Sequence, residues 1–250
     1  MINWWQSIVL GIVEGITEFL PISSTGHLTV TEKLMGLPID DPSVTAYTAV
    51  IQVGAMIASI IYFWGDIVRF ATAWFAGLRN ADKRGSDYRM GWAIIAGFIP
   101  TAVIALLAEN LITGVLRSLW AVVIGLVGWS IVMFIGDRVG KQTRGEDSIT
   151  WKDGALLGLI QCFSLIPGVS RSGATISGAL FLGIDRLTAT RMSFFLGIPT
   201  LVAAGGLQAV TQASAITAGV GWGATVMGTL QRLARTLSYR DISLVSLTGG

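Results

Sequence analysis

The sequence predicts an all-α fold: a polytopic membrane helix bundle made of two inverted-topology repeats, each containing a re-entrant helical hairpin. Three observations predict it. Apolar residues make up 52% of the 250 positions and charged residues only 13%, which is too apolar for an ordinary soluble domain. Several long stretches carry no charge, and one segment occurs twice, starting at Gly11 and again at Gly158. A soluble bundle of buried helices is disfavoured, because these stretches would require far more polar surface elsewhere.

The charge-free stretches predict the membrane spans. They cover residues 43–65, 90–108, 118–136 and 192–231. Each of the first three can cross the hydrocarbon core once, because a spanning helix needs about 20 apolar residues. The fourth is long enough for two crossings, with a turn near 208–214. The sequence therefore predicts five full spans in a single integral membrane domain over residues 1–230.

Lysine and arginine predict the orientation, because they are enriched in cytoplasmic loops. The loops 65–91 and 137–153 are rich in both residues and are predicted inside. The first repeated segment (6–35) is followed by a loop predicted outside, whereas the second (154–186) has inside loops on both flanks. The two segments are therefore expected to enter the membrane from opposite sides.

Each copy of the repeated segment is predicted to form a re-entrant hairpin, because Pro21 or Pro167 bends it and each half is too short for a comfortable span. The two repeats, at about 1–136 and about 154–230, then meet near the midplane. Interrupted segments of this kind are the best sequence pointer to a binding site in a membrane protein. A kinked full span stays open for the first segment, since residues 1–13 are neutral.

Two glutamates precede the proline of the first copy. Glu14 and Glu18 are four residues apart and therefore lie on one helix face. Carboxylates inside an apolar segment are costly and rarely accidental. The pair predicts a site for a divalent cation or for a shared proton. The alternative is that both carboxylates face a water-filled vestibule and carry no chemistry.

The residues after this proline predict an anion site. Ser23, Ser24, Thr25 and Gly26 stand at the start of a new helix, where free N–H groups and the helix dipole attract anions. An N-cap would account for one hydroxyl, but not for three in a row. His27 is the single histidine of the chain. A lone histidine is more often a packing residue, but its place three residues after Ser24 makes it a candidate for acid–base or nucleophilic chemistry.

The second copy repeats this design with a cation. Ser170, Arg171, Ser172, Gly173 and Thr175 follow its proline. Arginine matches phosphate oxygens through two parallel hydrogen bonds. Since no carboxylate occurs between Gly154 and Ile184, the guanidinium must find its partner in another segment, such as a glutamate of the first copy, or in a ligand phosphate.

Together the two tips hold carboxylates, hydroxyls, one imidazole and one guanidinium, a set that suits phosphoryl chemistry on an anionic ligand in the membrane. The alternative is a transporter or lipid flippase, because inverted repeats with broken helices are also a transporter design. The glutamate, serine and histidine set favours the enzyme, since anion transport does not require it. The net charge of +2 says little about partners, and we expect the bilayer and no nucleic acid.

The run from Glu14 to His27 and the run from Pro167 to Thr175 resemble the two signature motifs of the bacterial undecaprenyl-diphosphate phosphatase family, the bacitracin-resistance type. The resemblance covers roughly residues 1–228, and the segments 47–61 and 194–199 are also similar to the family. It implies a hydrolase that converts undecaprenyl diphosphate to undecaprenyl phosphate and inorganic phosphate, recycling the lipid carrier of peptidoglycan synthesis. The family works in the bacterial plasma (inner) membrane from its outer face, with Mg²⁺ or Ca²⁺.

The resemblance also implies roles for the residues of both tips. Glu14 and Glu18 would bind the metal, and Glu18 would also take part in acid–base chemistry. Ser24 or His27 would be the nucleophile or its activator, and Arg171 would clamp the phosphates. The residues expected around the phosphates are Ser23, Thr25, Gly26, Ser170, Ser172, Gly173 and Thr175. The expected partner is the polyprenyl lipid, and a homodimer is left open.

Residues 231–250 depart from the family pattern. The family has six spans plus two hairpins, but this chain turns polar at Gln231 and carries arginines that cannot cross a bilayer. We therefore expect the final transmembrane helix to be missing and the polar tail to lie inside, with three spans in the first repeat and two in the second. An inactive, truncated family member is accordingly the third functional alternative.

Overall fold

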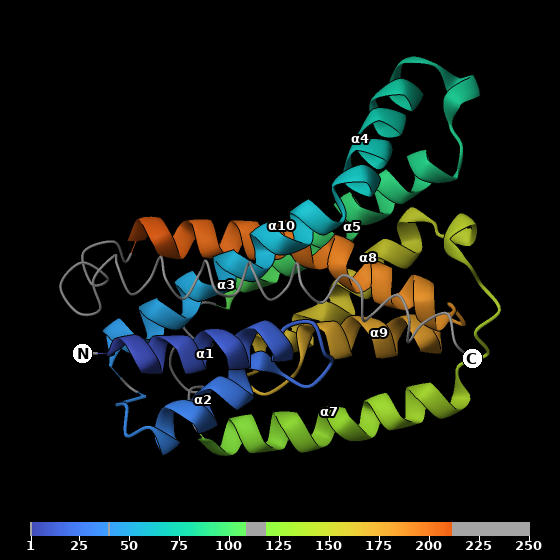
Figure 1. Cartoon of the computed structure of the whole chain (residues 1–250). Coiled ribbons are helices and arrows are strands. Elements are labelled where there is room, and N and C mark those ends of the chain that lie inside the picture. The colour runs from blue at the N-terminus through green and yellow to red at the C-terminus, as the bar shows by residue number, and fades with distance from the viewer. Residues whose placement is uncertain (1, 40, 109–118, 212–250) are drawn as a thin grey trace. The chain divides into compact units, whose positions relative to one another are not determined.

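The computed structural model describes residues 2–39, 41–108 and 119–211, and this part of the chain is helical (Figure 1). An isolated bridge between Arg144 and Ile184 is the only extended pairing in it. The all-α prediction is therefore confirmed for the described residues. The α-helices are α1 (Trp4–Thr17), α2 (Ser24–Leu34), α3 (Pro42–Tyr62), α4 (Trp64–Arg79), α5 (Ser86–Leu107), α7 (Leu119–Val139), α8 (Trp151–Gln161), α9 (Arg171–Phe181) and α10 (Arg186–Thr211). The 3-10 helices are η1 (Ala81–Lys83), η2 (Glu146–Ser148) and η3 (Cys162–Leu165).

Long apolar helices occupy the predicted spans. In the described residues α5, α7 and α10 are long and apolar enough to cross a membrane, and a fourth span results if the end of α3 and α4 are counted together. The helix α3, with 21 residues, covers most of the stretch 43–65. The predicted turn near 208–214 does not begin at 208, because α10 continues to Thr211. The second crossing of 192–231 and the tail 231–250 lie outside the described residues.

The segment predicted as a cytoplasmic loop, 65–91, is largely helical. The structure folds Trp64–Arg79 into α4 and begins α5 at Ser86, before the predicted span. Asp66 and Arg69 lie one turn apart on α4 and form an ion pair of 3.0 Å. An acid in the first turn and an arginine in the last turn also complement the helix dipole. Arg69 and Arg79, two of the basic residues that indicated a loop, therefore stabilise a helix.

The chain divides into two compact units. In the described part, the first unit contains residues 2–20, 24–62 and 201–211, and the second contains 21–23 and 63–200. The first unit has its own apolar core, and within it the buried Tyr47 hydroxyl donates a 3.2 Å hydrogen bond to the Ser7 carbonyl. The buried residues of this core are Ile2, Leu10, Leu28, Leu37, Val44, Tyr47 and Ile51.

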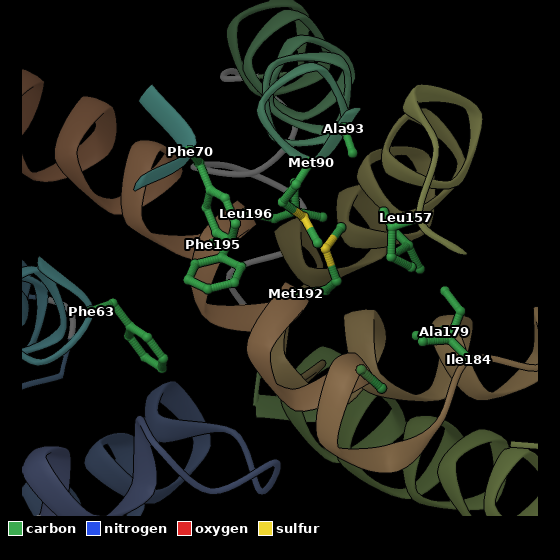
Figure 2. Packing of buried hydrophobic residues seen from close by; sticks show 12 residues of the cluster. Phe63, Phe70, Met90, Ala93, Leu157, Ala179, Ile184, Met192, Phe195 and Leu196 are labelled. Carbon is green, nitrogen blue, oxygen red and sulfur yellow. The ribbon is translucent and has the colours of Figure 1, made fainter. Parts of the chain in front are cut away.

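The second unit has a larger core, which joins α4, α5, α8, α9 and α10 (Figure 2). Phe195 of α10 lies between two other rings, 5.2 Å from the Phe63 ring and 5.1 Å from the Phe70 ring, with both pairs close to perpendicular. Edge-to-face geometry of this kind is the preferred arrangement for aromatic pairs. Met90, Leu157 and other apolar side chains complete the cluster and tie α10 to the helices beside it.

Small residues let α5 and α8 approach closely. A Cβ atom added to Gly154 would overlap the Ala93 carbonyl, and one added to Gly158 would overlap the Gly97 carbonyl. The Thr101 hydroxyl donates a 3.0 Å hydrogen bond to the Gly158 carbonyl across the same contact. Two glycines four residues apart form the small-residue pattern that allows helix backbones to pack together in a membrane.

The helix α7 runs along α9 and along the break before it (Figure 1). Gly125 of α7 leaves room for the Pro167 carbonyl, since an added Cβ would lie 2.6 Å from it. Gly136 and Gly140 lie in the same way against the backbone carbonyls of Ser177 and Leu180. The break in the second repeated segment is thus held by a neighbouring helix.

Candidate active site

The first tip is the break between α1 and α2. The helix α1 begins with a capping box, in which Asn3 and Gln6 exchange hydrogen bonds, and ends with Glu18 as its C-cap. The chain then bends, and α2 begins at Ser24. Ser23 has a φ of 62°, in the left-handed region that side chains other than glycine rarely adopt. Such strained positions concentrate at functional sites.

The residues at the two sides of this break meet. The Ser24 hydroxyl donates a 2.6 Å hydrogen bond to Oε2 of Glu18. Glu14, one turn earlier on α1, is fully buried, and Ser24 is 9% exposed. The first tip therefore brings a serine hydroxyl onto a carboxylate, with a second carboxylate on the same helix in a site shielded from solvent.

The residues that follow Ser24 alternate between buried and exposed positions. Gly26 is buried, whereas the side chains of Thr25 and His27 are exposed. The hydroxyl contact that the structure gives to Ser24 comes from Glu18. The Glu18 carboxylate is therefore within hydrogen-bonding distance of the Ser24 hydroxyl.

The second tip is the break between η3 and α9. Gly168 turns the chain with a φ of +94°, and a Cβ on it would overlap the Val122 carbonyl of α7, so glycine is required there. Ser170 is the N-cap of α9, and its hydroxyl oxygen accepts a 3.1 Å hydrogen bond from the N–H of Gly173. The hydroxyls of Ser170 and Ser172 lie 3.1 Å apart. Both serines and Gly173 are buried.

The Arg171 guanidinium is held against α10. Its Nη1 donates a 3.0 Å hydrogen bond to the Ser193 carbonyl. A Cβ atom on Gly197, one turn further along α10, would collide with the same guanidinium. The sequence analysis did not single out Ser193 or Gly197 as site residues, although Gly197 lies in the segment 194–199 that resembles the family. Glycine at 197 is therefore a condition for this position of Arg171.

Thr175 belongs to a buried polar network rather than to an open surface. Its hydroxyl lies 3.4 Å from Oε1 of Gln161 and 3.1 Å from the Arg171 carbonyl. The Gln161 amide donates in turn to the hydroxyls of Thr101, at 3.3 Å, and Thr200, at 3.0 Å. Gln161 stands where the first copy has Glu14, so the second tip has a neutral, hydrogen-bonded amide in place of a carboxylate.

The break of the first copy belongs to the same compact unit as the second tip. This unit contains 21–23 together with the whole second repeated segment. Inside it, a Cβ atom on Gly173 would lie 3.3 Å from the Pro21 carbonyl oxygen. The absence of a side chain at Gly173 lets the first proline break pack on the first turn of α9.

Glu14 and Glu18 suit a magnesium or calcium ion as a pair. They are successive-turn carboxylates beside a hydroxyl, and Mg²⁺ is commonly bound by one or two carboxylates plus water and substrate phosphate oxygens. The described residues contain no group of three or more histidine, cysteine, aspartate or glutamate side chains that could hold a metal. A metal at this tip would therefore need ligand oxygens besides the protein carboxylates.

Comparison with known proteins identifies the family. The profile of the family described as bacitracin resistance protein BacA matches residues 7–239, further into the C-terminal tail than the motif resemblance reached. The chain is 51% identical over 233 residues to undecaprenyl-diphosphatase 3 of Frankia casuarinae, covering 93% of this chain and 84% of the relative. It is also 51% identical over 239 residues to undecaprenyl-diphosphatase of Cutibacterium acnes, covering 92% and 84%. Undecaprenyl-diphosphatase 1 of Streptomyces avermitilis is 49% identical over 245 residues, covering 97% and 87%. The chain therefore belongs to the BacA family of bacitracin resistance proteins.

Proposed function

We propose that this protein is a membrane phosphatase that hydrolyses undecaprenyl diphosphate to undecaprenyl phosphate and inorganic phosphate. The hydrogen bond from Ser24 to Glu18 is the observation that carries the chemistry, because it pairs a nucleophile with a base. Relatives about half identical to this chain are named undecaprenyl-diphosphatase, which supports the substrate. The reaction returns the lipid carrier to peptidoglycan synthesis and accounts for the link to bacitracin resistance in the family description.

The reaction begins with attack by Ser24. Its oxygen forms a bond to the terminal phosphorus of the substrate, while the hydroxyl proton passes to the Glu18 carboxylate. The bond from that phosphorus to the bridging oxygen breaks, and undecaprenyl phosphate leaves with the electron pair. Glu18 passes the first proton to the departing phosphate oxygen and is a carboxylate again. Water then attacks the phosphoserine while Glu18 accepts one of its protons, the bond from phosphorus to the Ser24 oxygen breaks, and Glu18 returns the proton to that oxygen, which releases inorganic phosphate and regenerates Ser24.

Arg171 supplies positive charge for the phosphates. In phosphoryl transfer the protein contributes mainly positioning and electrostatic stabilisation of the equatorial oxygens. A guanidinium can donate to two phosphate oxygens at once, and a fixed position against Ser193 and Gly197 reduces the reorganisation needed on binding. The buried serines at 170 and 172 and the first turn of α9 add donors beside it.

A divalent cation would balance the negative charge of the Glu14 and Glu18 carboxylates. Glu14 and Glu18 would hold Mg²⁺ or Ca²⁺, which would neutralise the phosphate oxygens when bound. Two carboxylates on successive turns of α1, one of them fully buried, support a cation at the first tip.

Both copies of the repeated segment are proposed to be re-entrant hairpins within the membrane. The helices of the first copy have 14 and 11 residues, and those of the second have 11 each. At 1.5 Å per residue an 11-residue helix is about 16 Å long, roughly half of the hydrocarbon core. The loop after the first copy lacks lysine and arginine, whereas basic loops flank the second copy, and this difference supports an inverted-repeat arrangement. We place the protein in the bacterial plasma membrane, with the site open to the outer face. A homodimer stays a prediction.

Trapping the intermediate tests the proposed function. The purified full chain is incubated with undecaprenyl diphosphate and Mg²⁺, phosphate release is measured, and parallel samples are quenched in acid and in alkali. Phosphate release together with an acid-stable phosphoserine at Ser24 is expected. An acid-labile phosphohistidine would assign the attack to His27 instead. Lipid movement across vesicles without phosphate release would contradict the enzyme and support a flippase.

The contribution of the C-terminal tail is tested in the same assay. The chain is compared with a version to which a sixth apolar span is added after residue 230. Phosphate release by the original chain shows that the two tips suffice for activity. Release only by the extended version would show that a sixth span is needed, as the third functional alternative requires.

A further inference from the structure

A second site for an anion lies outside the two tips, at the N-terminal ends of α5 and α8. A groove of about 330 Å³ opens there in the second unit. Its walls combine two cations, two tryptophans and two hydroxyl side chains. The residues that line it are Tyr88, Arg89, Trp92, Thr150, Trp151 and Lys152.

The two cations of the groove are not engaged in ion pairs among the described residues. Arg89 and Lys152 are exposed, and across the ranges that the structure describes neither forms an ion pair. Arg89 Nη2 donates a 2.8 Å hydrogen bond to the Asp147 carbonyl, which holds one edge of the guanidinium and leaves the other edge toward solvent. The groove therefore presents two positive charges from two different helices.

Three carboxylates neighbour the groove in sequence or by contact, and two of them have partners elsewhere, whereas the exposed Asp147, whose carbonyl contacts Arg89, offsets one of the two positive charges. Asp87 lies 3.6 Å from Arg69, and Asp153 accepts a hydrogen bond of 2.9 Å from Arg144. Because Asp87 and Asp153 are paired elsewhere, they do not compete strongly for the cations of the groove. A ligand with negative charge would meet a net positive surface.

The aromatic side chains place this groove at the membrane boundary. Trp92 stands in the second turn of α5, a helix suited to span the membrane, and is 36% exposed, whereas Trp151 is 56% exposed. Tryptophan is enriched at the head-group level of membranes. Trp74 of α4 packs edge-on against Trp92, with ring centroids 5.5 Å apart, and fixes one wall. Lys152 lies over the Trp151 ring, 5.9 Å from its centroid.

We propose that the groove binds the head group of an anionic phospholipid, with the phosphate between Arg89 and Lys152 and the glyceride region against the two tryptophans. Basic pockets between membrane helices on the cytoplasmic side are typical sites for anionic lipid head groups. The lysine and arginine content of the loops 65–91 and 137–153 predicts that this end is cytoplasmic. The groove shares no residue with the proposed catalytic site, and it is predicted to face the inner leaflet, whereas the catalytic site is proposed to open to the outer face.

Lipid retention by the full chain tests this proposal without any measurement of hydrolysis. Protein in detergent is mixed with phosphatidylglycerol or with phosphatidylcholine, and native mass spectrometry counts the bound lipid. Wild type should retain phosphatidylglycerol in preference to phosphatidylcholine. The double variant Arg89→Gln with Lys152→Gln should bind it about thirtyfold more weakly, since each interfacial cation contributes to anionic lipid binding.

Two further variants control for fold and for charge in general. Arg138→Gln removes an exposed cation that lies 4.6 Å over the Phe134 ring at the end of α7, outside the groove, and should leave retention unchanged. The charge-conserving double variant Arg89→Lys with Lys152→Arg should retain the lipid. Equal retention by wild type and the glutamine double variant would overturn the proposal. Displacement of the lipid by inorganic phosphate would also overturn it, because the occupant would then be free phosphate.

Discussion

The Ser24 hydroxyl donates a 2.6 Å hydrogen bond to Oε2 of Glu18, six residues earlier in the chain and on the other side of the break between α1 and α2. O–H···O⁻ bonds of this length are charge-assisted and among the stronger hydrogen bonds in proteins. The left-handed backbone at Ser23 supports the sharp turn that brings the two side chains together. The Ser24 hydroxyl and the Glu18 carboxylate are therefore held together by a strained local segment.

We expect Ser24 and Glu18 to act as one catalytic unit. Ser24→Ala and Glu18→Gln should each reduce phosphate release by about 10³-fold or more, because one removes the nucleophile and the other its base. The double variant should be no worse than the single ones, since residues that work as a unit show non-additive losses. Initial rates of phosphate release for the four proteins measure this coupling.

The control for this cycle is Thr31→Ala on the same helix. The Thr31 hydroxyl bonds to the His27 carbonyl within α2, and removal of it should leave the rate within about twofold of wild type. Losses of Ser24→Ala and Glu18→Gln that multiply in the double variant would show that the two residues act independently. That outcome would contradict the proposed proton transfer.

Gly197→Ala is expected to displace the Arg171 guanidinium. The added methyl group would occupy the position of Nη1, and the flexible end of the arginine would move away. Loss of one fixed charge donor costs about 10²-fold to 10³-fold in turnover. The thermal unfolding midpoint should change little, since the side chain that must move is not backbone. Steady-state kinetics and a thermal melt of the same preparation measure both quantities.

The same substitution at Gly128 serves as the control. Gly128 lies on α7 with nothing within 4 Å of an added Cβ, so Gly128→Ala should keep full activity and stability. Full turnover by Gly197→Ala would mean that the observed position of Arg171 is not needed for catalysis. A large loss of stability in that variant would instead point to a structural role for Gly197.

The contact between α5 and α8 should be intolerant of any side chain. Gly154→Ala would push a methyl group into the Ala93 carbonyl, and backbone cannot move aside as a flexible side chain can. Overpacking of this kind costs about 1–3 kcal/mol. The unfolding midpoint in detergent should fall by several degrees relative to wild type and to Gly128→Ala. An unchanged midpoint would show that the two helices can separate without loss of stability.

The sequence was sufficient to predict the three apolar helices α5, α7 and α10, because absence of charge over about 20 residues has one common physical cause in a membrane protein. It does not predict α4, since Arg69 and the other basic residues of 65–91 indicate a cytoplasmic loop. Charges spaced one turn apart stabilise an exposed helix as readily as they solubilise a loop. The charge pattern alone therefore predicts which segments are apolar enough for the membrane, but it does not predict whether a polar segment is a helix or a loop.

The site was predictable where its contacts are local. Glu18 and Ser24 are neighbours along the chain, and the proline break between them indicated their proximity. The support of Arg171 by Ser193, 22 residues away, depends on how α9 packs on α10, and no local pattern encodes it. The Thr175 hydroxyl joins the Gln161 network inside the second unit, and its contact with a phosphate stays a prediction. Helix packing therefore decides which hydroxyl groups of a motif can contact a ligand and which bond to other protein side chains.

Acid should destabilise the start of α8 through Asp153. This buried carboxylate accepts two 2.9 Å hydrogen bonds from Arg144, and others from Thr150. Burial raises the pKa of Asp153, but the hydrogen bonds from Arg144 and Thr150 outweigh it, so the pKa lies below its ordinary value. The unfolded carboxyl titrates at about 3.9, so the stabilisation is complete above that pH and is lost as the pH falls through the lower folded pKa.

Thermal melts of the protein in detergent over a pH series measure this effect. Asp153→Asn should lower the unfolding midpoint at neutral pH, because it removes the ion pair, and should flatten the fall in midpoint that wild type shows under acid. Asp82→Asn, at an exposed position in η1, is the matched control and should follow the wild-type curve. Parallel acid curves for wild type and Asp153→Asn would mean that other carboxylates cause the loss of stability. In that case the capping box and arginine pair at the start of α8 would contribute nothing that depends on pH.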